Sequence, residues 1–152
     1  MYTVAQEQRA LASLMEFEHA LLEEERDLRA SSGLGSNDVV VLRLVVDADA
    51  DGHLLTPSDI AKTLGTSSAA TTAIVDRLEV AGHIRRLPNP LDRRSIVLSP
   101  IMAPDSAASE ALAASRRRRE ALVEMLSPAE REAMASALTL LARSLVGGQR
   151  DD

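Results

Sequence analysis

The chain has 152 residues, with 17 basic and 23 acidic side chains and a formal net charge of −6. This length suits one compact domain with a hydrophobic core and is too short for two ordinary ones. Tyr2 and Phe17 are its only aromatic residues, which disfavours stacking sites for single-stranded nucleic acid or sugars. The absence of cysteine excludes disulfides, thiolate nucleophiles and thiol redox sensing.

The charge is distributed unevenly along the chain. Residues 1–52 carry four basic and eleven acidic residues, whereas residues 53–98 carry six basic and four acidic residues. The acidic average disfavours a nucleic-acid partner, but the local positive excess indicates an anion-binding surface in the middle third. No apolar run approaches the roughly 20 residues that span a bilayer, and the first residues do not resemble a signal peptide. We therefore expect a cytoplasmic protein without a membrane partner.

The first third is predicted to be helical. Residues 4–30 have the apolar periodicity of one long helix, which Gly33 is suited to end. Ser36 is the expected cap of a second helix, with Asp38 in its first turn. The β-branched run 39–46 would also suit a buried strand, and its context favours a buried helix.

The middle third contains two short predicted helices after a polar turn over 47–52 and a short strand over 53–55. The first helix begins at Thr56, which caps it ahead of a proline at the first helical position. Gly65 ends this helix, and a second one follows over 66–81. Two short helices joined by a tight turn with glycine predict a helix-turn-helix.

Two strand-like segments, 84–87 and 96–98, follow and flank the turn-rich tip 88–94. A hairpin directly after a helix-turn-helix is typical of a wing. A further helix is expected from near Pro104 to Leu126.

The last helix begins at the capping box Ser127-Pro128-Ala129-Glu130. It carries one apolar stripe and ends at Gly147-Gly148. The stripe consists of Met134, Leu138, Leu141 and Leu145.

The start of the second short helix has the composition of a DNA-reading surface. A helix that enters the major groove needs small polar side chains near its N-terminus, so that its backbone can approach the base edges. The same residues could be ordinary cap and surface residues. The candidates for base contacts are Ser67, Ser68, Thr71 and Thr72.

Basic residues around this helix favour the DNA hypothesis. Arg77 and Lys62 are candidates for phosphate contacts. Arg93 and Arg94 lie at the wing tip, where the negative potential of a minor groove attracts arginine.

These motifs resemble the winged helix-turn-helix of the MarR family of bacterial transcriptional regulators. The resemblance extends over about residues 34–146 and is sharpest over 56–99. Its closest matches are Leu64-Gly65, Val75-Asp76-Arg77-Leu78-Glu79, Gly82, Asp92-Arg93-Arg94 with Ile96-Val97-Leu98-Ser99, and the terminal segment 126–132.

The resemblance implies a mainly α fold with a small β-wing. Its single domain, residues 1–152, would comprise a winged helix-turn-helix lobe and dimerisation helices on both sides of that lobe. The implied bounds are 36–99 for the lobe, 1–35 and 100–147 for the dimerisation helices, and 148–152 for the tail.

The resemblance further implies a homodimeric, ligand-responsive repressor that binds double-stranded DNA at a pseudo-palindromic operator. Arg94 would enter the minor groove, with its guanidinium held by a salt bridge to Asp92. Arg86 and Asn89 complete the set of candidate DNA contacts. Phenolic or carboxylate compounds are the effectors that such a family suggests.

The chain departs from the family pattern at three positions. Ala73 stands where many members have arginine or lysine, Ser68 replaces a frequent proline, and Asn89 replaces a frequent acid. We therefore expect base readout through hydroxyl and methyl contacts rather than guanidinium–guanine pairs.

Charged residues interrupt the apolar stripes of the outer helices. Glu18 and Glu25 fall within the stripe of the first helix, and Arg119 falls within that of the helix ending near Leu126. One hypothesis is that Arg119 pairs with one of these glutamates within or across a dimer. The alternative is that all three lie at a solvated rim, and Arg119 or His19 could also serve an anionic effector.

Catalytic and metal-binding motifs are not evident. His19, His53 and His83 are isolated, and no phosphate loop, nucleophile elbow or pair of carboxylates is present. We therefore expect neither an enzyme nor a cofactor or metal site. The competing hypothesis is a winged-helix protein–protein interaction module without specific DNA binding.

Overall fold

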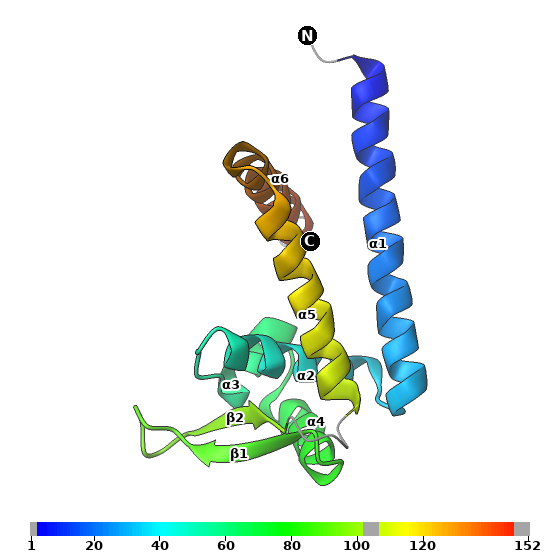
Figure 1. Ribbon diagram of the computed structural model, residues 1–152. Helices are drawn as coiled ribbons and strands as arrows, with labels where there is room; N and C mark the ends of the chain where they lie inside the picture. Colours follow the sequence, from blue (N-terminus) through cyan, green and yellow to red (C-terminus); the bar gives the residue numbers. More distant parts are fainter. Residues whose placement is uncertain (1–2, 102–106, 148–152) are drawn as a thin grey trace. The chain divides into compact units, whose positions relative to one another are not determined.

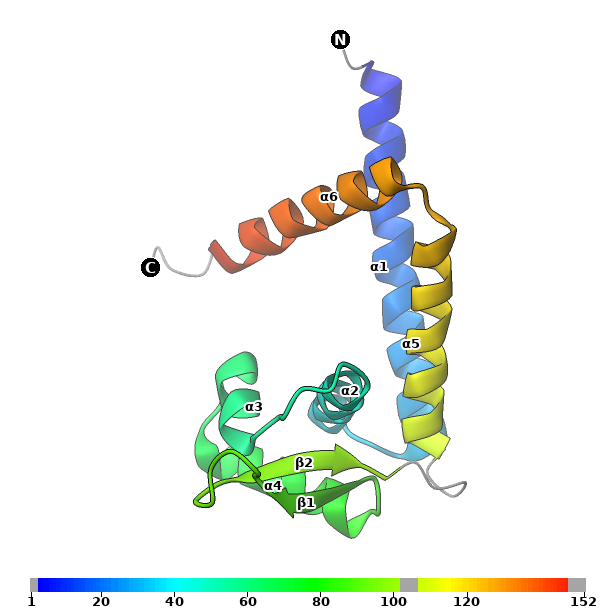
Figure 2. The same ribbon diagram turned by 60° about the vertical axis from the view of Figure 1, so that its left-hand side comes forward.

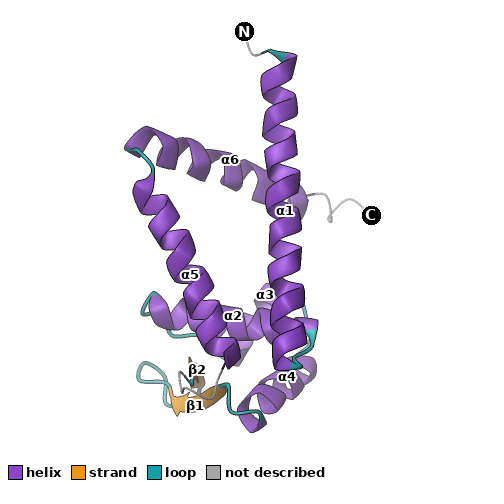
Figure 3. Ribbon diagram, turned by 45° about the vertical axis from the view of Figure 1, so that its right-hand side comes forward, coloured by secondary structure: helices purple, strands orange, loops and turns teal. Residues whose placement is uncertain are grey.

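The computed structural model describes residues 3–101 and 107–147, and the side chains up to residue 144. Its internal contacts divide the chain into two units, Met1–Ala113 and Ala114–Asp152. Each unit is described by itself below. Figure 3 shows that the described elements are helices and one small antiparallel sheet.

Two helices open the first unit: α1 (Val4–Ser32) and α2 (Ser36–Ala50). α1 ends at Gly33, whose φ of 69° lies in the left-handed region that glycine tolerates. The expected cap of α2 is shifted by one residue, because Gly35 is the cap and the Asp38 carboxylate accepts its backbone N–H. The β-branched run is helical and buried, as predicted.

The polar segment after this run continues α2 to Ala50, so the turn predicted over 47–52 is shorter than expected. The predicted strand at 53–55 is also reduced. It consists of one bridge, in which the Leu98 N–H donates to the Leu55 carbonyl at 2.9 Å. This bridge connects the segment to β-strand residue Leu98 of the wing.

The winged lobe is formed by α2, α3 (Pro57–Leu64), α4 (Ser68–Val80), β1 (Ile84–Pro88) and β2 (Ile96–Pro100), as Figures 1 and 2 show. β1 and β2 form an antiparallel hairpin in which Arg86 lies opposite Leu98. The predicted helix-turn-helix and wing are therefore confirmed.

Local sequence signals determine both short helices. Thr56 caps α3 by accepting the backbone N–H of Asp59 at 3.2 Å, and the Asp59 carboxylate accepts the N–H and hydroxyl of Thr56 in return. Hydrogen bonds from Thr56 lower the pKa of Asp59. Gly65 ends α3 with a φ of 62°, which places α4 directly after a tight turn.

One aliphatic core joins these elements. Leu42 and Val45 of α2, Ile60 of α3, Leu78 of α4 and Ile84 of β1 are fully buried. Ala108 and Leu112, from the first turns of α5 (Ala107–Met125), complete this core. An aliphatic core of this kind holds α4 against α2 and α3 without aromatic residues.

The second unit contains the remainder of α5 and α6 (Pro128–Gly147). The predicted capping box is present, since Glu130 accepts the N–H and hydroxyl of Ser127 at 2.8 and 2.7 Å. Arg131 donates to the carbonyls of Val123 and Glu124, which satisfies the C-terminal end of α5. The expectations for Pro104 and Gly148 lie outside the described residues.

Most of the apolar residues of α1 are exposed within the single chain. Leu28 is the only buried residue of this helix, whereas Leu11, Met15 and Leu22 are about 60% exposed. Of the described side chains on the stripe predicted for α6, Leu138 is 46% exposed. None of the described helices is long and apolar enough to cross a membrane.

Replacing Thr56 by alanine should lower the free energy of unfolding by about 1 kcal/mol, because the backbone N–H of Asp59 loses its acceptor. Thermal or urea unfolding would measure the change. Ser58→Ala, at an exposed position in the same turn, is the matched control and should be nearly neutral. Equal stability losses in both variants would contradict the assigned capping role.

Candidate nucleic-acid interface

The N-terminus of α4 presents small polar side chains to solvent. Ser67 caps the helix and accepts the backbone N–H of Ala70 at 3.2 Å. Ser68 and Thr72 are exposed, and the Thr72 hydroxyl donates to the carbonyl of Ser68 at 2.8 Å. Ala73 is also exposed, so this face has no bulky side chain to prevent close approach of a base edge.

Thr71 does not share this exposed face, which corrects its assignment as a base contact. Its side chain is 1% exposed, and its hydroxyl lies 3.1 Å from that of Thr66. The reason is helical periodicity, since Thr71 lies on the same face as Ile74, Val75 and Leu78, which are buried. The two hydroxyls instead join the turn before α4 to its inner face.

The wing tip is closed by hydrogen bonds within the tip itself. The Asn89 side chain donates to the Ser95 hydroxyl at 2.8 Å and accepts the Leu91 N–H at 2.9 Å. The Ser95 N–H donates to the Asp92 carbonyl at 3.0 Å. These bonds link residues 89–95 to one another and so restrict the conformation of the tip.

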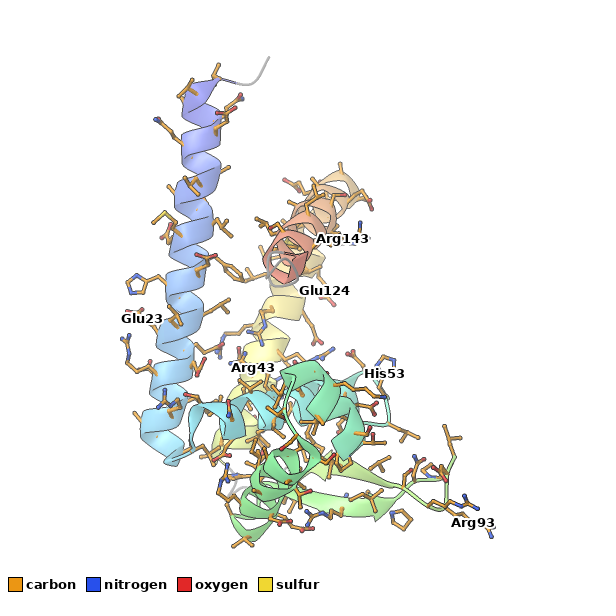
Figure 4. The ribbon with its side chains drawn as sticks, turned by 180° about the vertical axis from the view of Figure 1, so that it is seen from behind. Glu23, Arg43, His53, Arg93, Glu124 and Arg143 are labelled. Atoms are coloured by element: carbon orange, nitrogen blue, oxygen red, sulfur yellow. The ribbon has the colours of Figure 1, made fainter. Side chains whose placement is uncertain are left out.

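Arg93 and Arg94 extend from this loop into solvent, and Figure 4 shows Arg93 at the far end of the wing. Among the described residues, neither guanidinium has an ion pair. The salt bridge expected between Asp92 and the Arg94 guanidinium is also not found there. The Asp92 carboxylate instead accepts the backbone N–H of Arg94 at 3.0 Å. The short aspartate side chain thus closes a local turn with the backbone and does not contact the guanidinium.

Arg77 has an intramolecular partner that sequence analysis did not identify. Its Nη2 lies 2.6 Å from Oδ1 of Asp38, and its Nε lies 3.4 Å from Oδ2 of the same carboxylate. This hydrogen-bonded ion pair raises the pKa of the Arg77 guanidinium. The pair joins α4 to the first turn of α2. The phosphate contact proposed for Arg77 remains a prediction, and a phosphate group would have to compete with Asp38 for the guanidinium.

Arg86 on β1 also pairs with α4. It donates to Asp76 at 2.5 Å and to Glu79. Both acids contribute to raising the pKa of this guanidinium, with the Asp76 hydrogen bond as the largest cause. The DNA contact predicted for Arg86 is likewise untested, and its observed role is to join the wing to α4.

Internal pairing leaves several exposed cations on α3 and the wing. Arg77 and Arg86 are neutralised by acids on neighbouring elements, whereas Lys62, Arg85, Arg93 and Arg94 are exposed. Lys62 lies in the last turn of α3, directly before the turn into α4. Exposed cations on both α3 and the wing are suited to contact a polyanion.

The residues proposed for an ion pair between the outer helices lie in different units. Glu18 of α1 is exposed, and Glu25 of α1 is half-buried. Arg119, on the part of α5 that belongs to the second unit, is also half-buried. The pairing of Arg119 with either glutamate therefore stays a prediction.

The sequence predicts Asp38 in a helical first turn but does not indicate its pairing with Arg77. An acid three residues after a glycine, as in Gly35 and Asp38, indicates a helix cap. It does not indicate a partner that is distant in sequence. In the described part of the chain, no group of three or more His, Asp or Glu residues could hold a metal ion.

The helix-turn-helix, its wing and their exposed cations define a winged helix-turn-helix protein. Residues 32–95 match the profile of the MarR family. Over this segment the chain is similar to the MarR family of regulators.

Two curated relatives illustrate the match. The uncharacterized HTH-type transcriptional regulator YfiV of Bacillus subtilis is 31% identical over 94 residues, which cover 62% of this chain and 59% of that protein. The multiple antibiotic resistance protein MarR of Salmonella typhimurium is 41% identical over 54 residues, or 36% of each chain. The chain thus matches less than two thirds of the length of these relatives.

Solved structures share the fold over almost the whole chain. The transcriptional regulator Tm0710 of Thermotoga maritima has a TM-score of 0.57 and 20% identity, over 95% of this chain and 99% of that one. The S. aureus MepR–DNA complex has a TM-score of 0.52 and 21% identity, over 86% and 96%. Both likenesses support the predicted fold class, mainly α with a small wing.

Asn89→Ala should loosen the wing tip, because the replacement removes both side-chain hydrogen bonds that close the loop. We expect faster amide exchange over residues 89–95 and unchanged exchange in α2. Leu91→Ala is the control, since its side chain is 85% exposed and only its backbone joins the turn. Unaltered exchange in Asn89→Ala would show that the tip is held by other means.

Burial lowers the pKa of His83, directly before β1, below its ordinary value of 6.5. The unfolded chain then binds the proton more readily than the folded one. The stability linked to His83 should therefore be complete above about pH 7.5 and fall as the pH decreases through 6.5 towards the folded pKa.

Urea unfolding across this range should show a smaller loss for His83→Gln than for the unaltered chain. His53→Gln, at an exposed position, is the control and should keep the full loss. The assignment fails if both variants retain the same pH dependence.

Proposed function

We propose that the chain is a sequence-specific, double-stranded DNA-binding transcriptional regulator. The observation that carries the proposal is the exposed start of α4 beside a wing whose Arg93 and Arg94 side chains are exposed and have no ion pair within the described part of the chain. A helix with small hydroxyl side chains suits the major groove, and exposed arginines suit the adjacent minor groove. The proposed contacts are Lys62, Ser67, Ser68, Thr72, Arg93 and Arg94.

The relatives support this reading of the site. MepR, which shares the fold, has been solved in complex with DNA. In the present chain the proposed readout of bases uses hydroxyl and methyl groups, because Ala73 and the serines offer no guanidinium to a guanine. The proposed function includes no catalytic activity. We place the regulator in the bacterial cytoplasm, where an operator would be found.

We propose that the regulator is a homodimer. In the single chain, α1 and α6 expose large apolar side chains that a soluble monomer rarely leaves in water. A second copy would cover such faces and would place two winged lobes on the two halves of a pseudo-palindromic operator. The exposed residues include Val4, Leu11, Met15, Phe17 and Leu22 of α1, and Leu138 and Leu140 of α6.

A ligand-responsive repressor is the finer form of the proposal. MepR has also been solved with ethidium bromide, so a protein of this fold binds an organic small molecule. For this chain we propose a phenolic or carboxylate effector, because the chain has no cysteine through which to sense oxidants.

Arg94→Ala should weaken binding to a duplex from the region upstream of the chain's own gene by roughly tenfold or more. A mobility shift repeated at several salt concentrations would measure both the affinity and its salt dependence. Arg9→Ala removes the same charge from an exposed position of α1 and should leave the affinity nearly unchanged.

An unaltered chain that binds this duplex no better than unrelated acidic proteins do, at low salt, would contradict the proposal. The protein–protein interaction module would then be the favoured function.

A further inference from the structure

One carboxylate lies where three parts of the lobe meet. Asp38 is in the first turn of α2, and its Oδ2 accepts the backbone N–H of Gly35 at 3.3 Å. The same carboxylate accepts Nη2 and Nε of Arg77 on α4. The end of the α1–α2 link, the start of α2 and helix α4 are therefore joined through one side chain.

The two partners are unequally buried. The side chain of Asp38 is 10% exposed, whereas that of Arg77 is 56% exposed. A carboxylate removed from water is costly unless it is paired and hydrogen-bonded. Because the planar guanidinium matches the carboxylate with two donors, the pair also restricts the orientation of Arg77. Arg77 is thus fixed by a buried acid and is not simply a surface cation.

A second ion pair holds the other flank of α4. Arg86 of β1 donates to Asp76 and Glu79, so the adjacent residues Asp76 and Arg77 are bound to different elements. Rotation of α4 about its axis would have to disturb one or both of these pairs. The exposed start of the helix, with Ser68 and Thr72, is turned outward by the same constraint.

We propose that Asp38 and Arg77 are positioning residues for DNA binding, and that Arg77 acts through Asp38 rather than as a phosphate ligand. The inference rests on the proposed function for its effect on DNA, but the coupling of the pair is measurable without DNA. It replaces the role that the sequence suggested for Arg77.

The first test measures hydrogen exchange of the α4 amides in the free protein, for Asp38→Asn, Arg77→Gln and the double variant. Asparagine keeps an oxygen that can accept the Gly35 N–H, so the cap of α2 is retained. Each single variant should exchange about tenfold faster in α4, and the double variant should be no faster than the worse single variant. Effects of the two changes that simply multiply would overturn the proposed pair.

The second test measures the salt dependence of binding to the upstream duplex. Arg77→Gln and Asp38→Asn should both weaken binding, with the slope of log K against log salt unchanged. If Arg77 instead binds a phosphate, Arg77→Gln should reduce that slope by about 0.9 for each protomer. In that case Asp38→Asn, which releases Arg77, should maintain or improve the affinity, and this result would overturn the proposal.

Two further variants keep the tests readable. Arg77→Lys retains the charge but loses the two-donor geometry, so its exchange rates and affinity should lie between those of Arg77→Gln and the unaltered chain. Arg94→Ala is the comparison for a DNA contact and should reduce the salt slope. A chain that binds no duplex would reject the proposed function, whereas the exchange coupling would still decide whether Asp38 and Arg77 act as a pair.

Discussion

The ion pair between Asp38 and Arg77 joins the first turn of α2 to α4, and it is the constraint that we propose orients α4 on the lobe. α4 packs against the core through the aliphatic side chains of Ile74, Val75 and Leu78. The ion pairs on its two flanks supply directional bonds, one to α2 and one to β1. In our proposal, these pairs keep the exposed hydroxyl side chains of Ser67, Ser68 and Thr72 directed to solvent.

The cations of residues 53–98 are divided between internal ion pairs and exposed positions. Two of the six cations in residues 53–98 are paired internally, Arg77 with one acid of α2 and Arg86 with two acids of α4. The wing tip uses Asp92 in a backbone turn, which leaves the guanidinium groups of Arg93 and Arg94 exposed. The net charge of −6 therefore describes the whole chain and not residues 53–98, which carry six basic and four acidic residues.

The sequence predicted most of the local structure because its signals were local. Thr56, Gly65 and Ser127 determine helix boundaries through caps within a few residues, and the structure confirms each of them. The hairpin followed from two apolar segments around a turn. The boundary of α2 was less certain, since a glycine cap with an acid at the third helical position resembles a serine cap in sequence.

The site was predicted less completely, because burial and distant pairing depend on the packed fold. Thr71 and Thr72 are adjacent residues of the same type, but the helical periodicity places the first on the buried face and the second on the exposed face. The partner of Arg77 lies 39 residues away in sequence, so no motif could indicate it. The exposed arginines of the wing were predictable because a tight turn at a hairpin tip leaves its side chains in solvent.

The central claim is that the start of α4 and the wing tip together form the DNA-binding surface. Hydrogen exchange of the whole chain, with and without the duplex from its own upstream region, tests this claim most directly. The account predicts slower exchange over residues 67–72 and 89–95, at salt concentrations where the duplex is bound. Protection confined to α1 or α6, with both of these segments unchanged, would contradict it.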